Sequence, residues 1–191
     1  MNGRVEVVNR ALGYLGEGPI QSMDEKSVPA NSARLIYDSV RRAVLREFNW
    51  SFAIKLVTLA RMDETPPDYR FAYTLPFDCV KVLRPRRPGV PSYIQDRDIM
   101  FEVRGNTLFA TETPLMLEYI ADVPDETMFD DLFAEAFAYK LASELAMPVA
   151  QSPSGKESNY QLYLHTVGKA AAVSGRETKD SLSGNPYVEA R

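Results

Sequence analysis

The chain has 191 residues, of which 45% are hydrophobic and 25% charged, with a formal net charge of −4. This composition is that of ordinary globular material and excludes a disordered or fibrous chain. No stretch approaches the ~18 uncharged apolar residues of a membrane span, and residues 1–10 contain no apolar signal-peptide core, so we expect a soluble protein made in the cytoplasm.

Cys79 and His165 are the single cysteine and the single histidine. They exclude a disulfide framework and a zinc site of the usual Cys/His kind, and a Cys-His or Ser-His relay would require the two to meet in space. We expect Cys79 to be a small buried group and His165 to lie on a helix. No cofactor or metal is predicted.

Two helices are predicted before residue 50. The first ends at residues 16–19, whose glycines and proline suit a helix end and a turn, and its apolar positions are Val5, Val8, Leu12 and Leu15. The second is capped by Asn31 or Ser32. Its apolar seam consists of Ile36, Tyr37, Val40, Ala43, Val44 and Phe48.

The hydrophobic period changes from helical to alternating after residue 49, which predicts a β region. Candidate strands cover residues 52–57, 70–75, 80–84, 98–103, 107–111 and 115–121. Gly105-Asn106 between two of them predicts a tight hairpin. Residues 84–91 contain three prolines, and each proline lacks the backbone N–H that a central strand donates to its neighbour. This segment is therefore predicted to be an exposed loop and not a central strand.

The stretch 127–148 predicts the central helix of the core. Phe129, Phe133, Phe137, Leu141 and Leu145 recur every four residues and form one apolar stripe. Thr127 is the expected cap, Asp130 and Asp131 suit the first turn of the helix, and Pro148 is the expected end. The predicted core consists of Phe48, Trp50, Phe129, Phe133, Phe137 and Leu141.

A fourth helix is predicted from Ser154, which has capping-box spacing with Glu157, to Gly175. Its expected buried face consists of Tyr160, Tyr163, Leu164, Val167, Ala171 and Ser174. From Glu177 to Arg191 the periodicity stops, and the segment is too polar to bury itself.

These elements predict a mainly helical α+β fold. Helices from the two ends of the chain form a four-helix bundle, a β-rich insertion lies between the second and third helices, and a tail extends from the C-terminus. The expected parts are residues 1–50 and 124–176 for the bundle, 51–123 for the β-rich insertion and 177–191 for a flexible tail.

Two clusters of charged residues suggest a catalytic or a binding site, and each also has a purely structural explanation. Asp130, Asp131 and Glu135 suggest the acid and base of a cell-wall or polysaccharide hydrolase, although acids in a first helical turn are already explained by the helix dipole. Lys81, Arg84, Arg86, Arg87 and Arg97 suggest phosphate contacts in a nucleic-acid-binding accessory protein. A solvated or protein-docking loop explains these bases better, because aromatic residues are not interleaved with them and the chain is acidic.

Four segments resemble the tail tubular protein A family, the head-to-tail adaptors of short-tailed bacteriophages. They are Leu15 to Ile20 (LGEGPI), Val44 to Ala53 (VLREFNWSFA), Tyr73 to Val82 (YTLPFDCVKV), and Tyr119 to Asp122 (YIAD) running into the helix that ends at Pro148. In the family's order they cover residues 4–175.

The resemblance implies a non-enzymatic virion protein of the tail or neck, present in the host cytoplasm during assembly. Twelve copies would form a ring beneath the portal, continue the DNA channel without binding DNA specifically, and contact a distal nozzle or a component like tail tubular protein B. Within this picture an acidic lumen of Asp122, Asp125, Glu126, Asp130 and Asp131 lets DNA slide, and Arg84, Arg86, Arg87 and Arg97 form a partner-facing loop. Leu182, Pro186, Tyr187 and Val188 of the tail dock on the portal.

Overall fold

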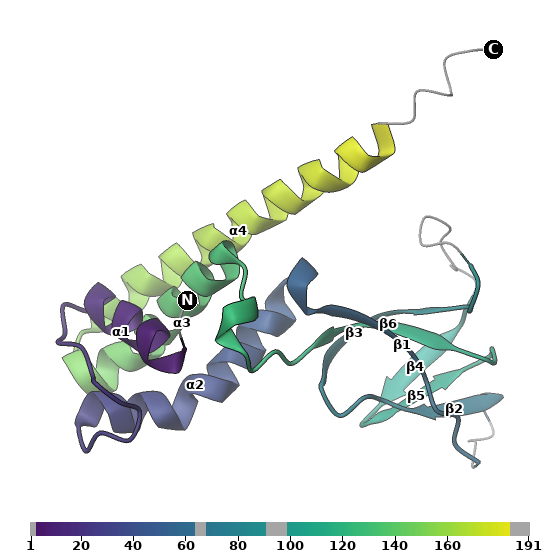
Figure 1. Ribbon diagram of the computed structural model, residues 1–191, viewed down its shortest axis with the longest axis horizontal. Coiled ribbons are helices and arrows are strands. Elements are labelled where there is room, and N and C mark those ends of the chain that lie inside the picture. Colours follow the sequence, from purple (N-terminus) through teal and green to yellow (C-terminus); the bar gives the residue numbers. More distant parts are fainter. Residues whose placement is uncertain (1–2, 64–67, 91–98, 184–191) are drawn as a thin grey trace. The chain divides into compact units, whose positions relative to one another are not determined.

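The computed structural model describes residues 3–63, 68–90 and 99–183, with side chains up to residue 173. It divides into a helical unit, Met1–Val44 with Pro124–Arg191, and a β unit, Leu45–Val123. Within the described residues there are four α-helices and two three-stranded antiparallel sheets, which confirms the predicted α+β class (Figure 1).

The helical unit is built around α3 (Asp131–Ala150), which packs against α1 (Arg4–Tyr14) and α4 (Pro153–Ser183) (Figure 1). Alanines alternate with large apolar residues on α3, so its burial is not confined to one stripe as the sequence predicted. The buried residues are Phe133, Ala134, Ala136, Phe137, Ala138, Leu141, Ala142, Ser143, Leu145 and Ala146. A helix that is apolar on most sides needs neighbours on most sides.

Aromatic contacts join the other helices to α3. Tyr14 of α1 stacks on Tyr139 with ring centroids 4.4 Å apart, and Tyr37 of α2 (Val28–Glu47) meets Phe137 edge-on at 5.0 Å. Phe133, Phe137 and Leu141 are fully buried, while Phe129 is half-buried and packs edge-on against Phe133.

Both predicted ends of α3 are wrong. The cap is Asp130, whose carboxylate accepts hydrogen bonds from the backbone N–H groups of Leu132 and Phe133, whereas Thr127 lies in the short 3-10 helix η2 (Glu126–Met128). The helix continues through Pro148 to Ala150, because a proline in the last turn removes a single intrahelical bond. Gln151, with φ 49°, then ends it in the left-handed region.

Helices α2 and α4 both begin earlier than predicted. The Ser27 hydroxyl accepts from the N–H of Ala30, so α2 starts at Val28 instead of after Asn31 or Ser32. The Ser152 hydroxyl accepts from the N–H of Gly155, and α4 starts at Pro153, a favoured first helical residue.

Helix α4 is longer than predicted and buries a different face. It continues to Ser183, because one glycine at 175 costs only about 1 kcal/mol and the following Arg, Glu and Lys favour helix. The expected loss of structure from Glu177 is therefore wrong for residues 177–183. The buried stripe is Asn159, Tyr163, Thr166 and Ala170, whereas Tyr160 and Leu164 are 37% and 45% exposed.

Polar residues fit in this buried stripe because they bond to their own helix. The Asn159 amide donates to the carbonyl of Gly155 at 2.8 Å, and the Thr166 hydroxyl donates to that of Leu162 at 2.9 Å. Each side chain therefore has a hydrogen-bond partner within α4, and hydropathy alone does not predict that these two residues are buried.

The β unit contains two sheets. One has the order β1 (Ile54–Thr58), β6 (Met116–Ala121), β3 (Cys79–Arg86), and the other the order β2 (Phe71–Thr74), β5 (Thr107–Ala110), β4 (Phe101–Arg104). Their shared core includes Tyr73, Leu75, Leu108, Ala110, Leu115, Leu117, Tyr119 and Ala121. A short 3-10 helix, η1 (Ser51–Ala53), precedes β1, and Trp50 beside it is buried and meets the half-buried Phe48 edge-on.

The hairpin of the β unit agrees with the sequence prediction, and the proline-rich segment does not. Val103 pairs with Leu108 and Arg104 with Thr107, which leaves Gly105-Asn106 as a two-residue turn with Gly105 at φ 60°. Residues 84–86 are not an exposed loop, since they form the end of β3 and pair with β6. Because β3 is an edge strand of its sheet, Pro85 is tolerated there.

Replacing Phe137 by Ala should lower the free energy of unfolding by about 3–5 kcal/mol, because it opens a cavity at the contact with Tyr37. Met147→Ala on the same helix, where the side chain is 46% exposed, is the matched control and should cost less than about 1 kcal/mol. Denaturant melts measure both, and equal losses would contradict the central place of Phe137.

Candidate functional site

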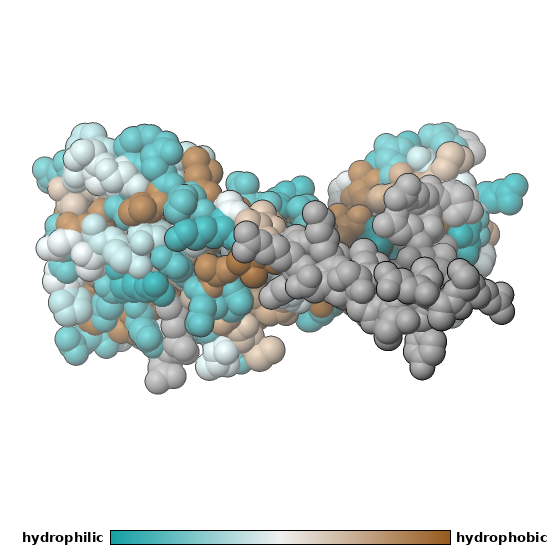
Figure 2. All heavy atoms as spheres, turned by 90° about the horizontal axis from the view of Figure 1, so that it is seen from above, coloured by the Kyte–Doolittle hydropathy of each residue, from teal (hydrophilic) through white to brown (hydrophobic). Residues whose placement is uncertain are grey.

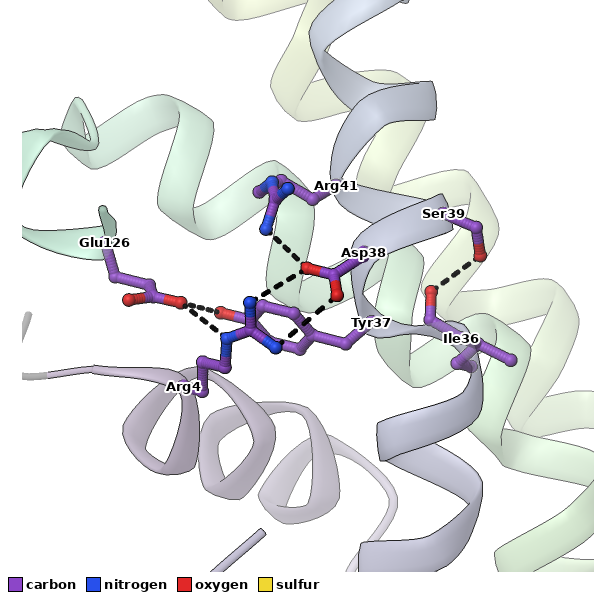
Figure 3. Close-up of polar contacts among 7 residues, drawn as sticks. All are labelled: Arg4, Ile36, Tyr37, Asp38, Ser39, Arg41 and Glu126. Carbon is purple, nitrogen blue, oxygen red and sulfur yellow. Dashed lines mark hydrogen bonds and ion pairs between the residues drawn. The ribbon is translucent and has the colours of Figure 1, made fainter. Parts of the chain in front are cut away.

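A polar cluster in the helical unit joins α1, α2 and the segment that leads into α3 (Figure 3). The Tyr37 hydroxyl donates to Glu126 at 3.1 Å, and Arg4 lies 3.4 Å from Glu126 and 3.1 Å from Asp38. Asp38 also pairs with the buried Arg41 at 2.6 Å. Burial, then the charge of Glu126, raises the pKa of Tyr37 far above its usual value, so this hydroxyl remains a donor.

The acids expected to face a channel have different local roles. Glu126 belongs to the cluster of Figure 3, and Asp130 caps α3. Asp125 accepts from the hydroxyl and the N–H of Thr127, and these bonds lower the pKa of Asp125. Asp131 is exposed in the first turn of α3, and Asp122 is half-buried at the end of the β unit.

The carboxyls named for a hydrolase do not form an acid and base pair. Asp130 is used as a helix cap, Asp131 is exposed and Glu135 is half-buried. None of the three lines the surface hollows of about 300 and 470 Å³ that the described residues form on α2 and α3 and in the β unit. The hydrolase hypothesis therefore has no geometric support.

The basic residues of the β unit are used within it. Arg84 and Arg86 lie 3.0 and 3.5 Å from Glu118 on the neighbouring strand, and Arg87 lies 3.3 Å from Glu112. Lys81 donates to the side chain of Asn49 at 3.1 Å. Arg97 lies outside the described residues. Phosphate contacts by the three arginines would compete with their ion pairs to Glu118 and Glu112, so the nucleic-acid hypothesis is not supported either.

A braced turn between β2 and β3 presents Phe77, whose side chain is 99% exposed. The next residue, Asp78, holds this turn in place. Its carboxylate accepts from Lys55 at 2.7 Å and from the Tyr119 hydroxyl at 3.0 Å, and its carbonyl accepts from the N–H of Asp122 at 2.7 Å. An aromatic side chain is thus held in solvent by a fixed backbone.

The electrostatics of the turn follow from these bonds. Burial raises the pKa of Asp78, but the hydrogen bonds from Lys55 and Tyr119 together outweigh it and lower that pKa overall. Burial, with the bond to Asp78, raises the pKa of Tyr119 to about 12. Burial also raises the pKa of the half-buried Cys79 thiol, so this cysteine is a poor nucleophile.

Sequence reasoning missed Phe77 as a surface residue. The available signal was its place between Pro76 and Asp78, two residues typical of turns, at the join of two predicted strands. Pro186, Tyr187 and Val188 of the predicted docking tail lie outside the described residues, and Leu182 falls within α4, beyond the described side chains.

Residues 5–124 match the family model described as tail tubular protein. The chain belongs to the tail tubular protein family. The match covers α1, α2 and the whole β unit, including the Phe77 turn, and ends before α3. No curated protein matches the chain.

As a tail tubular protein, the chain is a structural component of the phage virion tail that assembles with other tail components. In the part of the chain that the structure describes, no helix is long and apolar enough to cross a membrane. Across those same residues, no group of acidic, histidine and cysteine side chains is arranged to hold a metal ion.

Replacing Tyr119 by Phe should destabilise the β unit by about 1–2 kcal/mol at pH 7, because the partly buried Asp78 carboxylate loses a donor. Asp78 has a lowered folded pKa, so its contribution is present above its usual pKa and is lost as pH falls through the lower folded value. The penalty of the substitution should therefore shrink below about pH 4.

The raised pKa of Tyr119 affects the stability of the β unit at high pH. Its contribution is complete below about pH 10 and is lost as pH rises through about 12. Tyr69→Phe, which removes a more exposed hydroxyl bonded to Glu102, is the control and should change stability by less than about 0.5 kcal/mol at pH 7. A Tyr119→Phe penalty independent of pH from 2 to 7 would contradict the role of Asp78.

Proposed function

We propose that this tail tubular protein is a non-enzymatic head-to-tail adaptor. Twelve copies form a ring beneath the portal, continue the DNA channel and carry the distal nozzle or a component like tail tubular protein B. The protein works in the neck of the virion and is assembled in the host cytoplasm. Each subunit uses its four helices as one bundle. The resemblance of the motifs at residues 15–20, 44–53 and 73–82 to adaptor proteins supports this role.

The observation that carries the proposal is the exposed Phe77 on its braced turn. Full burial of a Phe side chain is worth roughly 1.5–3 kcal/mol, and the single chain leaves that gain unused. Lys55, Tyr119 and the backbone of Asp122 hold the turn, so little conformational freedom is lost when a partner covers Phe77. Buried aromatic anchors of this kind dominate many protein interfaces.

The channel of the proposed ring is lined by acids, which repel the DNA backbone and prevent sticking. Asp131, exposed on α3, suits this role best, together with Asp122, Asp125, Glu126 and Asp130 as far as their local bonds allow. A map of the ring with all five acids on the outer wall would rule out this part of the proposal.

Phe77→Asp should abolish assembly into tails while leaving the melting temperature unchanged, because Phe77 makes no use of its apolar surface within the chain. Electron microscopy of the purified protein mixed with portal, and then with the distal tail component, measures ring occupancy at both steps. Phe77→Trp keeps a large aromatic and is the matched control, which should assemble. Normal tails with Phe77→Asp would contradict the contact.

The end of the chain supplies the portal contact in this proposal, through Leu182, Pro186, Tyr187 and Val188. Because α4 continues to Ser183, the deletion that tests docking begins at residue 184. Removing residues 184–191 should leave a folded protein with reduced occupancy on purified portal, measured by sedimentation. Replacing the same eight residues by a Gly/Ser segment controls for length. Wild-type occupancy by the truncated protein would exclude the tail as the portal contact.

A further inference from the structure

The two sheets of the β unit are joined along one side and open along the other. After β1, the Ala60 carbonyl accepts from the N–H of Thr74 at 3.3 Å, and the Met62 N–H donates to the carbonyl of Ala72 at 2.8 Å. These backbone bonds carry the chain from β1 onto the outer edge of β2. At the opposite ends of the two sheets, β3 and β4 are edge strands with no such link among the described residues.

A hollow of about 470 Å³ lies between these two open edges. It is lined by residues 79–82 of β3, by Val103 and residues 105–106 at the end of β4, and by Arg46 and Leu75. Leu75 and Cys79 lie on either side of the turn that presents Phe77, so the hollow adjoins the surface proposed for a partner contact. Figure 2 shows hydrophobic side chains among hydrophilic ones on the described surface of the β unit.

The open edge of β4 has backbone groups arranged to receive another strand. The Thr111 N–H donates to the Met100 carbonyl at 3.3 Å, so the backbone of Met100 faces β5. In an antiparallel ladder, successive residues alternate between facing the neighbouring strand and facing away from it. The N–H and C=O groups of Phe101 and Val103 therefore point away from β5, towards the open edge.

The side chains of the same two residues are incompletely covered. Phe101 pairs with Ala110 and Val103 with Leu108, and opposite residues of an antiparallel pair lie on one face of the sheet. Ala110 and Leu108 are fully buried in the core, whereas Phe101 and Val103 are 39% and 40% exposed. A further strand beside β4 would cover these core-face side chains and pair with their backbone groups at the same time.

The charged residues that line the hollow are both basic. The Arg46 guanidinium donates to the carbonyl of Val80 at 2.6 Å, and the Lys81 ammonium donates to the side chain of Asn49 at 3.1 Å. A guanidinium has five N–H donors and an ammonium three, so each side chain retains donors for an incoming carboxylate.

Acids of the β unit do not neutralise this charge. Asp78 is paired with Lys55 at 2.7 Å and Glu102 with Arg104 at 2.8 Å, and Glu47 does not line the hollow. Across the described residues, no acid forms an ion pair with either base of the hollow. Charge complementarity therefore favours an occupant with a negative side chain.

The acidic segment that enters α3 is already used within its own chain. The Asp122 N–H donates to the Phe77 turn, Asp125 accepts from Thr127, and Asp130 caps α3. The occupant is therefore expected from a different protein.

We propose that an extended segment of a different tail component adds to the open edge of β4 as a further strand. An apolar side chain of this segment fills the hollow beside Val103, and a carboxylate pairs with Arg46 and Lys81. The inference rests on the proposed function, in which another tail component contacts the β unit, and it names the kind of segment that makes the contact beside Phe77.

The single cysteine allows a test without any substitution, because Cys79 lines the hollow and is half-buried. Purified protein and intact virions are treated with iodoacetamide at about pH 9, which offsets the raised pKa of this thiol. Alkylation of Cys79, followed by mass spectrometry, should be at least about tenfold slower in virions, because the added strand covers the hollow. Equal rates would overturn the inference. So would equal protection in rings of the purified protein alone, since a second copy would then supply the cover.

Val103→Pro tests the strand pairing, because it removes an N–H that points to the open edge and leaves the bonds to β5 in place. Leu56→Pro is the matched control. The Leu59 N–H donates to the Leu115 carbonyl, so by the same alternation the N–H of Leu56 points away from β6, on the open edge of β1. In a mixture with portal and distal tail component, Val103→Pro should lose the protection of Cys79, and Leu56→Pro should keep it.

Lys81→Glu tests the charge and decides the question if Val103→Pro does not fold. Replacing attraction by repulsion should weaken the protection of Cys79 about two- to tenfold in the same mixture. Arg70→Glu makes the same change of charge at an exposed residue of the β unit that does not line the hollow, and it should leave the protection unchanged.

The outcomes separate the two proposals. Wild-type protein that forms no ring on portal would overturn the adaptor function, while the comparison of virions with free protein still decides the strand. Rings that form on portal and carry the distal component with Cys79 as reactive as in free protein would overturn the strand alone. Protection that persists in both Val103→Pro and Lys81→Glu would do the same.

Discussion

The burial of α3 is the constraint on which the helical unit depends. The side chains of Phe133 and Phe137 must be packed against other helices on one side of α3. The small alanines between them allow helices to approach α3 closely on its other sides. The cover comes from helices at both ends of the chain, before residue 45 and after residue 152. The strands between them therefore form a unit of their own, with its own core.

The Tyr37, Arg4 and Glu126 contacts make this arrangement specific. Apolar packing alone would tolerate sliding of α2 along α3, whereas a buried hydroxyl bonded to a carboxylate fixes one position. Glu126 lies in the short η2 helix just before α3, so the same bonds also set where the chain enters α3. The acidic composition of this segment thus has a structural cause, besides any effect on DNA.

Much of the fold could be predicted from the sequence, because strong periodicity and turn chemistry are local. The hairpin at Gly105 and the existence of four helices follow from such signals. The errors come from features that depend on neighbours. Pro85 is permitted in β3 only because that strand is at an edge, and Asn159 and Thr166 are buried only because each bonds to its own helix. Phe77 was missed because its flanking Pro76 and Asp78 indicate a turn, whereas the exposure of its ring depends on how Lys55, Tyr119 and Asp122 hold that turn.

The misassigned face of α4 is informative in a different way. Tyr160, Leu164, Val167 and Ala171 have the spacing of a buried stripe, yet the chain buries them only in part. An apolar stripe at helical spacing indicates a face suited to burial, and a contiguous apolar patch left exposed is typical of a site of interaction. A protein that works as part of a phage tail is selected in its assembly, so a stripe exposed in the single chain is expected where subunits meet.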